Sequence, residues 1–253
     1  TTGSYNTAIG YNALYTNSGS YNTSMGVDSL RYNTTGYYNT AQGNNSLRSN
    51  TTGNYNTSQG YNSLYSNTTG GSNTAIGYYT LNLNSTGHGN TAMGMESLRR
   101  NTASYNTAVG YNTLKNTTTG NDNTAQGYSS LYSNTTGDSN TAQGYASLYA
   151  NTTGDNNTAL GYESLRLNTT GTQNTAQGYQ ALHNNTIGNY NTTIGYASLY
   201  SNTTGSYNTA VGHRAGRYQS DDSTNPSGSN SVYIGYNTKA SGSVDAETNQ
   251  IVI

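Results

Sequence analysis

Strongly apolar side chains recur along this chain at an interval of about seventeen residues, separated by polar stretches. One repeat, residues 139–155, reads SNTAQGYASLYANTTGD and contains a single leucine. The interval is too short for a pair of helices, and glycines mark two turns in each repeat. It suits one coil of a solenoid, with two short strands and two corners. We therefore expect an all-β parallel β-solenoid of about thirteen 17-residue coils.

The columns of the repeat differ in how far they vary. The first Asn occurs at thirteen positions, and ten of the twelve steps between them are 17 residues. Asn, Thr and Gly of the motif NTAxG are present in every copy, and Leu is present in all twelve copies of the second half. The residue two places before Leu varies freely, so the fixed columns indicate structural constraint. Representative framework residues are Asn140, Asn151, Asn157, Leu131, Leu148, Gly144 and Gly161.

The fixed Asn columns predict hydrogen-bonded ladders. One Leu and one Tyr per coil contribute about 3–6 kcal/mol of burial, whereas ordering a coil costs about 25 kcal/mol. Identical amides one coil apart hydrogen-bond along a stack and supply part of the difference. The N-T-T motif also matches a glycosylation sequon, but an inward-facing Asn151 could not carry a glycan.

Pairs of adjacent restricted columns predict an oligomer. Neighbouring residues of a strand point to opposite faces, yet Ser147 and Leu148 are both in restricted columns, as are Thr141 and Ala142. One face of each strand must look into the coil. We expect the other face to pack against another chain.

A lengthwise stripe of Tyr and basic residues follows the Leu column. Its representative members are Tyr132, Tyr149, Arg166 and Tyr200. Two interpretations remain open: Tyr rings and Arg stems that cover apolar neighbours, or a recognition surface for a host-surface glycan or receptor. The residue before the first Gly alternates between apolar side chains and Gln, which indicates a semi-buried position at a seam between chains.

Composition excludes several functions. Only 8% of residues are charged and the net charge is −1, so the chain lacks the basic face that nucleic acid requires. No apolar run approaches the roughly 20 residues of a membrane span, and the absence of Cys excludes disulfides and thiolate metal sites. The three His residues lie in unrelated columns, and no carboxylate pair lies in a fixed column. We expect no enzyme, no catalytic or metal site and no cofactor.

The repeat pattern ends after residue 212. Residues 1–212 form the array, and residues 213–228 contain the only Pro and the densest charge, which predicts a loop insertion. Residues 229–253 begin with a diverged coil, SNSVYIGYNTKASGS, that we expect to lead into a continuing fibre.

Two motifs carry a resemblance to known fibres. The segment SNSVYIGYNTKA resembles the head repeats of trimeric autotransporter adhesins, and the NTAxGYxSL array ending in TNQIVI is similar to the repeat regions of phage tail fibres. The resemblance covers nearly the whole chain. It implies a left-handed parallel β-roll, a side-by-side homotrimer, and an extracellular location on a virion tail fibre or a bacterial cell surface.

The expected function follows from that resemblance. It is a structural and adhesive segment of an extracellular trimeric fibre, a phage tail fibre that presents a receptor-binding tip. One alternative is a bacterial surface adhesin of the trimeric autotransporter type. A second is an ice-binding β-solenoid, because flat Thr arrays order water, although Asn and bulky Tyr flank the Thr columns in the sequence.

Overall fold

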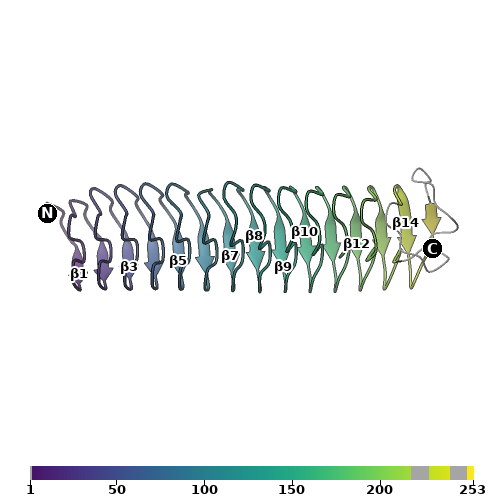
Figure 1. The fold of residues 1–253 in the computed structure, drawn as a ribbon, viewed down its shortest axis with the longest axis horizontal. Helices are drawn as coiled ribbons and strands as arrows, with labels where there is room; N and C mark the ends of the chain where they lie inside the picture. Colours follow the sequence, from purple (N-terminus) through teal and green to yellow (C-terminus); the bar gives the residue numbers. More distant parts are fainter. Residues whose placement is uncertain (1, 218–227, 240–249) are drawn as a thin grey trace. The chain divides into compact units, whose positions relative to one another are not determined.

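The chain folds into short parallel strands joined by turns. The computed structural model describes residues 2–217, 228–239 and 250–253, which Figure 1 draws in colour. Within these residues the structure contains fifteen β-strands and no helix. The chain divides into two units, residues 1–123 and 124–253, and each is a parallel β-solenoid. The prediction of an all-β parallel solenoid with about thirteen repeat coils is therefore confirmed.

In the first unit each strand pairs in parallel with the strand of the next coil. The register is that of the repeat, so that Thr40 lies beside Thr57 and Ala41 beside Ser58. The strands are β1 (Thr7–Ile9), β2 (Thr23–Met25), β3 (Thr40–Gln42), β4 (Thr57–Gln59), β5 (Thr74–Ile76), β6 (Thr91–Met93) and β7 (Thr107–Val109).

The second unit repeats this arrangement, as Figure 1 shows. In it Thr141 pairs with Thr158 and Ala142 with Ala159. The strands are β8 (Thr124–Gln126), β9 (Thr141–Gln143), β10 (Thr158–Leu160), β11 (Thr175–Gln177), β12 (Thr192–Ile194), β13 (Thr209–Val211), β14 (Ser231–Ile234) and β15 (Gln250–Val252).

The second half of each coil is a run of turns, so the prediction of two strands per coil is wrong. In the coil that contains β9, Ala146 has φ 49° and Leu148 has φ 50°, both in the left-handed region. These angles bend the backbone repeatedly, and Ser147 and Leu148 both point inward, each fully buried. Two adjacent buried columns therefore need no partner chain in this half of the coil. For the strand, where Ala142 is buried and Thr141 is half-exposed, a second packed face stays a prediction.

The left-handed backbone explains why the core column contains Leu alone. All twelve residues of this column have φ between 45° and 52°. Most L-residues reach this region at a cost of roughly 1–2 kcal/mol, and β-branched side chains fit it worst. The chain uses Ile and Val elsewhere, so their exclusion from this column reflects backbone conformation as well as hydrophobicity.

Leu148→Ile is therefore expected to cost about 2–3 kcal/mol of unfolding free energy, because the branched Cβ clashes in the left-handed conformation. Leu148→Met keeps a similar volume without the branch and should cost under about 1.5 kcal/mol. Urea unfolding followed by circular dichroism measures both. An equal loss for the two variants would contradict the conformational explanation.

Two Asn ladders line the interior of each coil. Asn157 donates its backbone N–H (2.9 Å) and side-chain Nδ2 (3.1 Å) to the Oδ1 of Asn140, and Asn151 Nδ2 donates to Asn134 Oδ1 at 2.9 Å. The two ladders meet at the carbonyl of Gly154, which accepts from Asn140 Nδ2 at 2.8 Å and from Asn151 Nδ2 at 2.9 Å. Each coil is thus bonded both across its interior and to its neighbour.

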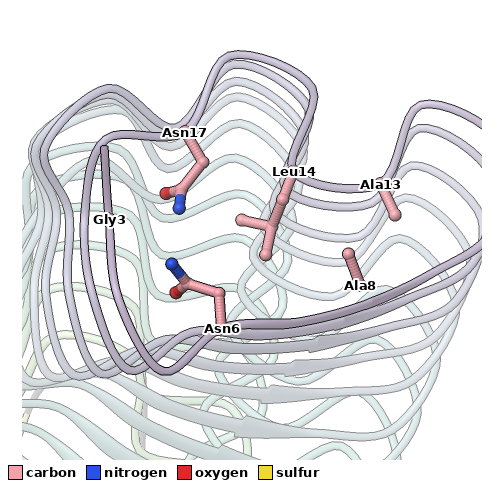
Figure 2. Close-up of a pocket in the computed structure, with 6 residues that line it drawn as sticks. All are labelled: Gly3, Asn6, Ala8, Ala13, Leu14 and Asn17. Atoms are coloured by element: carbon pink, nitrogen blue, oxygen red, sulfur yellow. The ribbon is translucent and has the colours of Figure 1, made fainter. Parts of the chain in front are cut away.

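Figure 2 shows this interior at the coil of β1, where a hollow of about 160 Å³ opens beside the first coil. The side chains of Asn6 and Asn17 point toward each other from opposite walls, and Ala8 and Ala13 face each other beyond Leu14. Leu14 thus lies between a pair of facing amides and a pair of facing Ala side chains.

In the last coils of the second unit a Tyr ring takes the place of the core Leu. Gly216 takes the place of Leu, with φ 62°, and a Cβ there would lie 2.7 Å from the ring of Tyr233. Tyr233 pairs with Ala210 and is 1% exposed, so its ring fills the space that the missing Leu leaves. Residues 213–217 follow the coil pattern, whereas residues 218–227 of the predicted loop and residues 240–249 of the predicted diverged segment lie outside the described residues.

Candidate functional site

The four residues of the predicted recognition stripe lie together in the second unit, all half-buried. The rings of Tyr132 and Tyr149 stack at 5.2 Å with an interplanar angle of 4°, and the Arg166 guanidinium lies 5.6 Å from the centre of the Tyr149 ring. Tyr200 stacks on His183 at 5.0 Å and lies under the Arg217 guanidinium, also at 5.0 Å. His183 belongs to the same sequence column, between Arg166 and Tyr200, and the structure adds Arg217 to the stripe.

An acidic column beside the stripe neutralises its bases. The Glu163 carboxylate lies 3.3 Å from Arg166 Nε and 3.6 Å from His183 Nε2. In the first unit Asp28 likewise contacts Arg31 and Arg48, and Glu96 contacts Arg99 and Lys115. Partly exposed pairs of this kind contribute roughly 0–1 kcal/mol each to stability, so their main effect is to leave the stripe with little net charge.

Sequence reasoning missed this network, because the acids lie in a column that varies freely. A signal was present. Asp28, Glu96 and Glu163 are each followed three residues later by Arg, and the acids of that column occur only in those three copies. Co-variation between two columns of one repeat was the clue to spatial contact.

The stacking also limits what the stripe can bind. A sugar that packs on an aromatic ring needs a free ring face, but Tyr132 and Tyr149 cover one another and Arg166 lies over Tyr149. Ring edges and phenol hydroxyls remain accessible. The arrangement favours polar, edge-on contacts over stacking as the mode of any glycan recognition.

A second aromatic column follows the first Gly of each repeat. In the second unit Tyr145, Tyr162, Tyr179 and Tyr196 stack face to face at 5.0–5.1 Å, and the stack continues through His213 to Tyr236. Partial burial, and after it the Glu163 carboxylate, raises the pKa of the Tyr162 hydroxyl above its usual value. The Tyr162 hydroxyl therefore stays protonated at neutral pH.

The outer face of the strands carries the fixed Thr column. In β2 to β13 the middle residue is buried and the two outer residues are exposed or half-exposed. Among the described residues, no hydroxyl of this column, from Thr7 to Thr209, hydrogen-bonds to another group of the chain. The fixed Asn, Gly and Leu columns each have an internal role, but the Thr column has none.

The column after the second Gly provides acceptors that sequence reasoning also missed. Asp155 Oδ1 accepts the N–H of Asp138 at 2.8 Å, and His88 Nδ1 accepts the N–H of Gly71 at 3.0 Å. Ser and Asn do the same in other coils. Asp138 and Asp155 occupy the same column one coil apart, and this column caps backbone N–H groups of the preceding coil.

Seven N-T-T sequons are closed to glycans in the folded chain. Their Asn side chains are fully buried and donate to the Asn of the preceding coil or to a Gly carbonyl; they are Asn33, Asn50, Asn67, Asn134, Asn151, Asn168 and Asn202. Two further N-T-T triplets begin at Asn191, which is also fully buried, and at Asn116, which is half-buried.

Two further searches concern only residues 2–217, 228–239 and 250–253. No group of three or more His, Asp or Glu side chains there is placed to hold a metal ion. No helix in that part of the chain has the length and hydropathy to cross a membrane.

Comparison of the chain with protein-family models, with curated proteins and with solved structures finds no match. A functional assignment therefore rests on the geometry of the coil.

Proposed function

We propose that this chain is a structural segment of an extracellular trimeric fibre, in which coils stack as a left-handed roll and three copies lie side by side. Such a segment acts as a spacer that presents a receptor-binding tip. One observation carries the proposal: within each unit, successive described coils are bonded through the strand backbones and the first Asn ladder, and the second Asn ladder joins most of them. A solenoid of this kind extends by adding coils, and each coil needs only its neighbours.

The surface chemistry supports a spacer over a catalyst. Arg166 of the stripe is paired with Glu163, and the Tyr132 and Tyr149 rings stack on one another. The side chains that look most like ligand-binding groups in the sequence therefore already have partners in the chain. A phage tail fibre is the first candidate for the whole protein and a bacterial surface adhesin is the second.

Ice binding is a second candidate function, and the outer face of the strands favours it. The Thr side chains of this face are exposed or half-exposed and in register, and their hydroxyls form no hydrogen bond within the part of the chain that the structure describes. The Asn residues that flank Thr in the sequence are buried, so they do not interrupt this face. Ice binding requires the Thr column to stay open to water in solution.

Light scattering on the isolated chain tests the proposed function. We expect a mass about three times the 26.7 kDa of one chain, because a homotrimer is proposed. A folded species with the mass of one chain at micromolar concentration would contradict it. A dimer would retain lateral packing but contradict the three-chain fibre.

A further inference from the structure

We propose that the first unit carries a binding site for a planar heteroaromatic ring, on the surface between Tyr55 and Tyr105. Both residues belong to the column just before the first Asn of each repeat, which we call the corner column. The inference goes beyond the proposed spacer and does not depend on the number of chains in the fibre. In the first unit the corner column reads Tyr5, Tyr21, Tyr38, Tyr55, Ser72, Gly89, Tyr105 and Asp122.

The corner column is an aromatic stack that is interrupted after Tyr55. The rings from Tyr5 to Tyr55 stack in order, with centres 4.8–5.4 Å apart and planes within 12° of parallel. One ring thus occupies one coil step. Among the described residues, the ring contacts of Tyr55 are with Tyr37 and Tyr38 of the preceding coil. The face of Tyr55 toward Ser72 therefore has no ring over it, in contrast to the mutually covered rings of the recognition stripe.

Tyr105 bounds the interruption on its other side. A Cβ at Gly89 would lie 2.8 Å from Cδ1 and 3.0 Å from Cε1 of the Tyr105 ring. The ring thus leans over the coil of Gly89 and takes space that a side chain there would need. The coil of Ser72 is left as the step without a ring between Tyr55 and Tyr105. A planar ring placed there would continue the stack from Tyr55 toward Tyr105 at the spacing that the column already shows.

Tyr105 has a conformational cost that no contact within the described chain offsets. Its φ is 60° and it is 64% exposed. The left-handed conformation costs an L-residue roughly 1–2 kcal/mol. Tyr21 and Tyr38 have the same conformation, but stacking on neighbouring rings returns about 0.5–1.5 kcal/mol per pair. An exposed aromatic residue held in this conformation without a ring partner in the described chain indicates a contact outside it.

Two hydrogen-bonding groups lie at the edge of the Ser72 step. His88 Nδ1 accepts the N–H of Gly71 at 3.0 Å, so the neutral imidazole carries its proton on Nε2. The His88 ring is exposed, and its Nε2–H has no partner in the part of the chain that the structure describes. The exposed Ser72 hydroxyl is equally unengaged there. A ring bound at this step would therefore meet donors at its edge, which favours a ring that carries acceptors.

These features select a neutral, planar heteroaromatic ring over a sugar or a nucleotide. A pyranose is puckered and thicker than an aromatic ring, so it suits a single step of a parallel stack less well. A nucleotide brings a phosphate, which needs a cation or a set of free backbone N–H groups. In the first unit neither the corner column nor the residue before it, from Ser4 to Asn121, includes Lys or Arg.

The test fills the empty step and measures caffeine binding to the full chain by ligand-observed NMR. Caffeine is a neutral purine with acceptors only, and a ligand of this size that uses one stacking site should bind with a Kd of about 1 mM. Ser72→Tyr places in the step the residue that the same column uses at Tyr55, and it should weaken binding at least tenfold. Undiminished binding to this variant, or no binding to the wild type, would overturn the site.

Ser139→Tyr is the matched control. Ser139 lies in the same column, is exposed and has φ 57°, against 58° for Ser72. Its column neighbours are Asp122 and Asn156, so the new ring fills no interval between two Tyr rings. Caffeine affinity should stay within about twofold of the wild type. A loss equal to that of Ser72→Tyr would contradict the placement of the site.

Tyr55→Ser covers the case in which Ser72→Tyr does not fold, which circular dichroism would detect. It introduces the residue that the column contains one coil later and removes the free ring face. We expect caffeine binding to weaken at least tenfold, and retained binding would overturn the role of Tyr55. Methyl glucopyranoside is the comparison ligand: binding of this sugar in place of caffeine would overturn the ligand class.

The outcome is separable from that of the proposed function. A chain that fails to bind caffeine but has the trimer mass would overturn this inference alone. A monomeric chain that binds caffeine, and loses binding in Ser72→Tyr, would contradict the trimeric fibre and support the site.

Discussion

Asn157→Asp is expected to lower the free energy of unfolding by about 3–5 kcal/mol at neutral pH, because it places an unpaired charge in the interior. Asn157 is fully buried. Its Nδ2 donates to Asn140 Oδ1 at 3.1 Å and to Gly171 O at 2.8 Å. A carboxylate has nearly the same shape as the amide but no N–H donor. The oxygens of Asn140 and Gly171, which accept from Asn157, would then face a negatively charged group.

The deficit of this variant should depend on pH. Burial disfavours the charged form, so the pKa of the introduced carboxyl rises above its unfolded value of about 3.9. A raised folded-state pKa means that stability is present below the unfolded pKa and is lost as pH rises through the folded pKa. The protonated carboxyl also regains one donor. Urea unfolding should therefore show a small deficit near pH 4 and the full deficit at pH 8.

Asn156→Asp is the matched control for this prediction. Asn156 is exposed, with φ 58°, and Asp122 occupies the same column in another coil with φ 57°. The same chemical change one residue away should alter stability by less than about 0.5 kcal/mol. Similar losses for the two variants would contradict the buried-ladder interpretation.

Gly144→Ala is the second large effect, with an expected loss of at least about 3 kcal/mol. Gly144 has φ 136°, a region that costs other residues roughly 1–3 kcal/mol. A Cβ there would also lie 2.7 Å from the carbonyl carbon of Gly161 in the next coil and closer still to its oxygen. Overpacking against a backbone adds about 1–3 kcal/mol.

Thermal unfolding measures this loss, with a decrease in Tm of about 6–12 °C for a chain of this size. Thr153→Ala, at an exposed corner position of the same coil, introduces the same residue and should leave the Tm within about 2 °C. A Gly144→Ala protein as stable as this control would show that neighbouring coils move apart at little cost.

The period, the coil count and the framework could be read from the amino-acid sequence. A column constant over thirteen copies identifies Asn140 and Asn157 as ladder members, and one constant over twelve identifies Leu131 and Leu148 as core residues, before any coordinates are seen. This works because a solenoid places equivalent residues one above the other, so that any contact between coils is a constraint on one column.

The members of the recognition stripe were also identified from their column, but their partners were not. Glu163 lies three residues before Arg166 in the sequence and contacts both Arg166 and His183 of the next coil. Adjacency between columns depends on the backbone path within a coil, and the repeat period does not specify that path. The same limit hid the capping role of Asp155.

Only the tertiary structure decided which side of the coil is a strand and which surface is left open. The restricted pair Ser147 and Leu148 has the pattern of a strand packed on both faces, but the left-handed φ angles of Ala146 and Leu148 turn both side chains inward. Such angles are stabilised by bonds to the neighbouring coil, such as Leu148 N–H to Ser164 O at 3.0 Å. A contact sixteen positions along the chain, not local propensity, thus selects the backbone conformation, and the Thr141 hydroxyl is left on the outer face of the strand without a partner among the described residues.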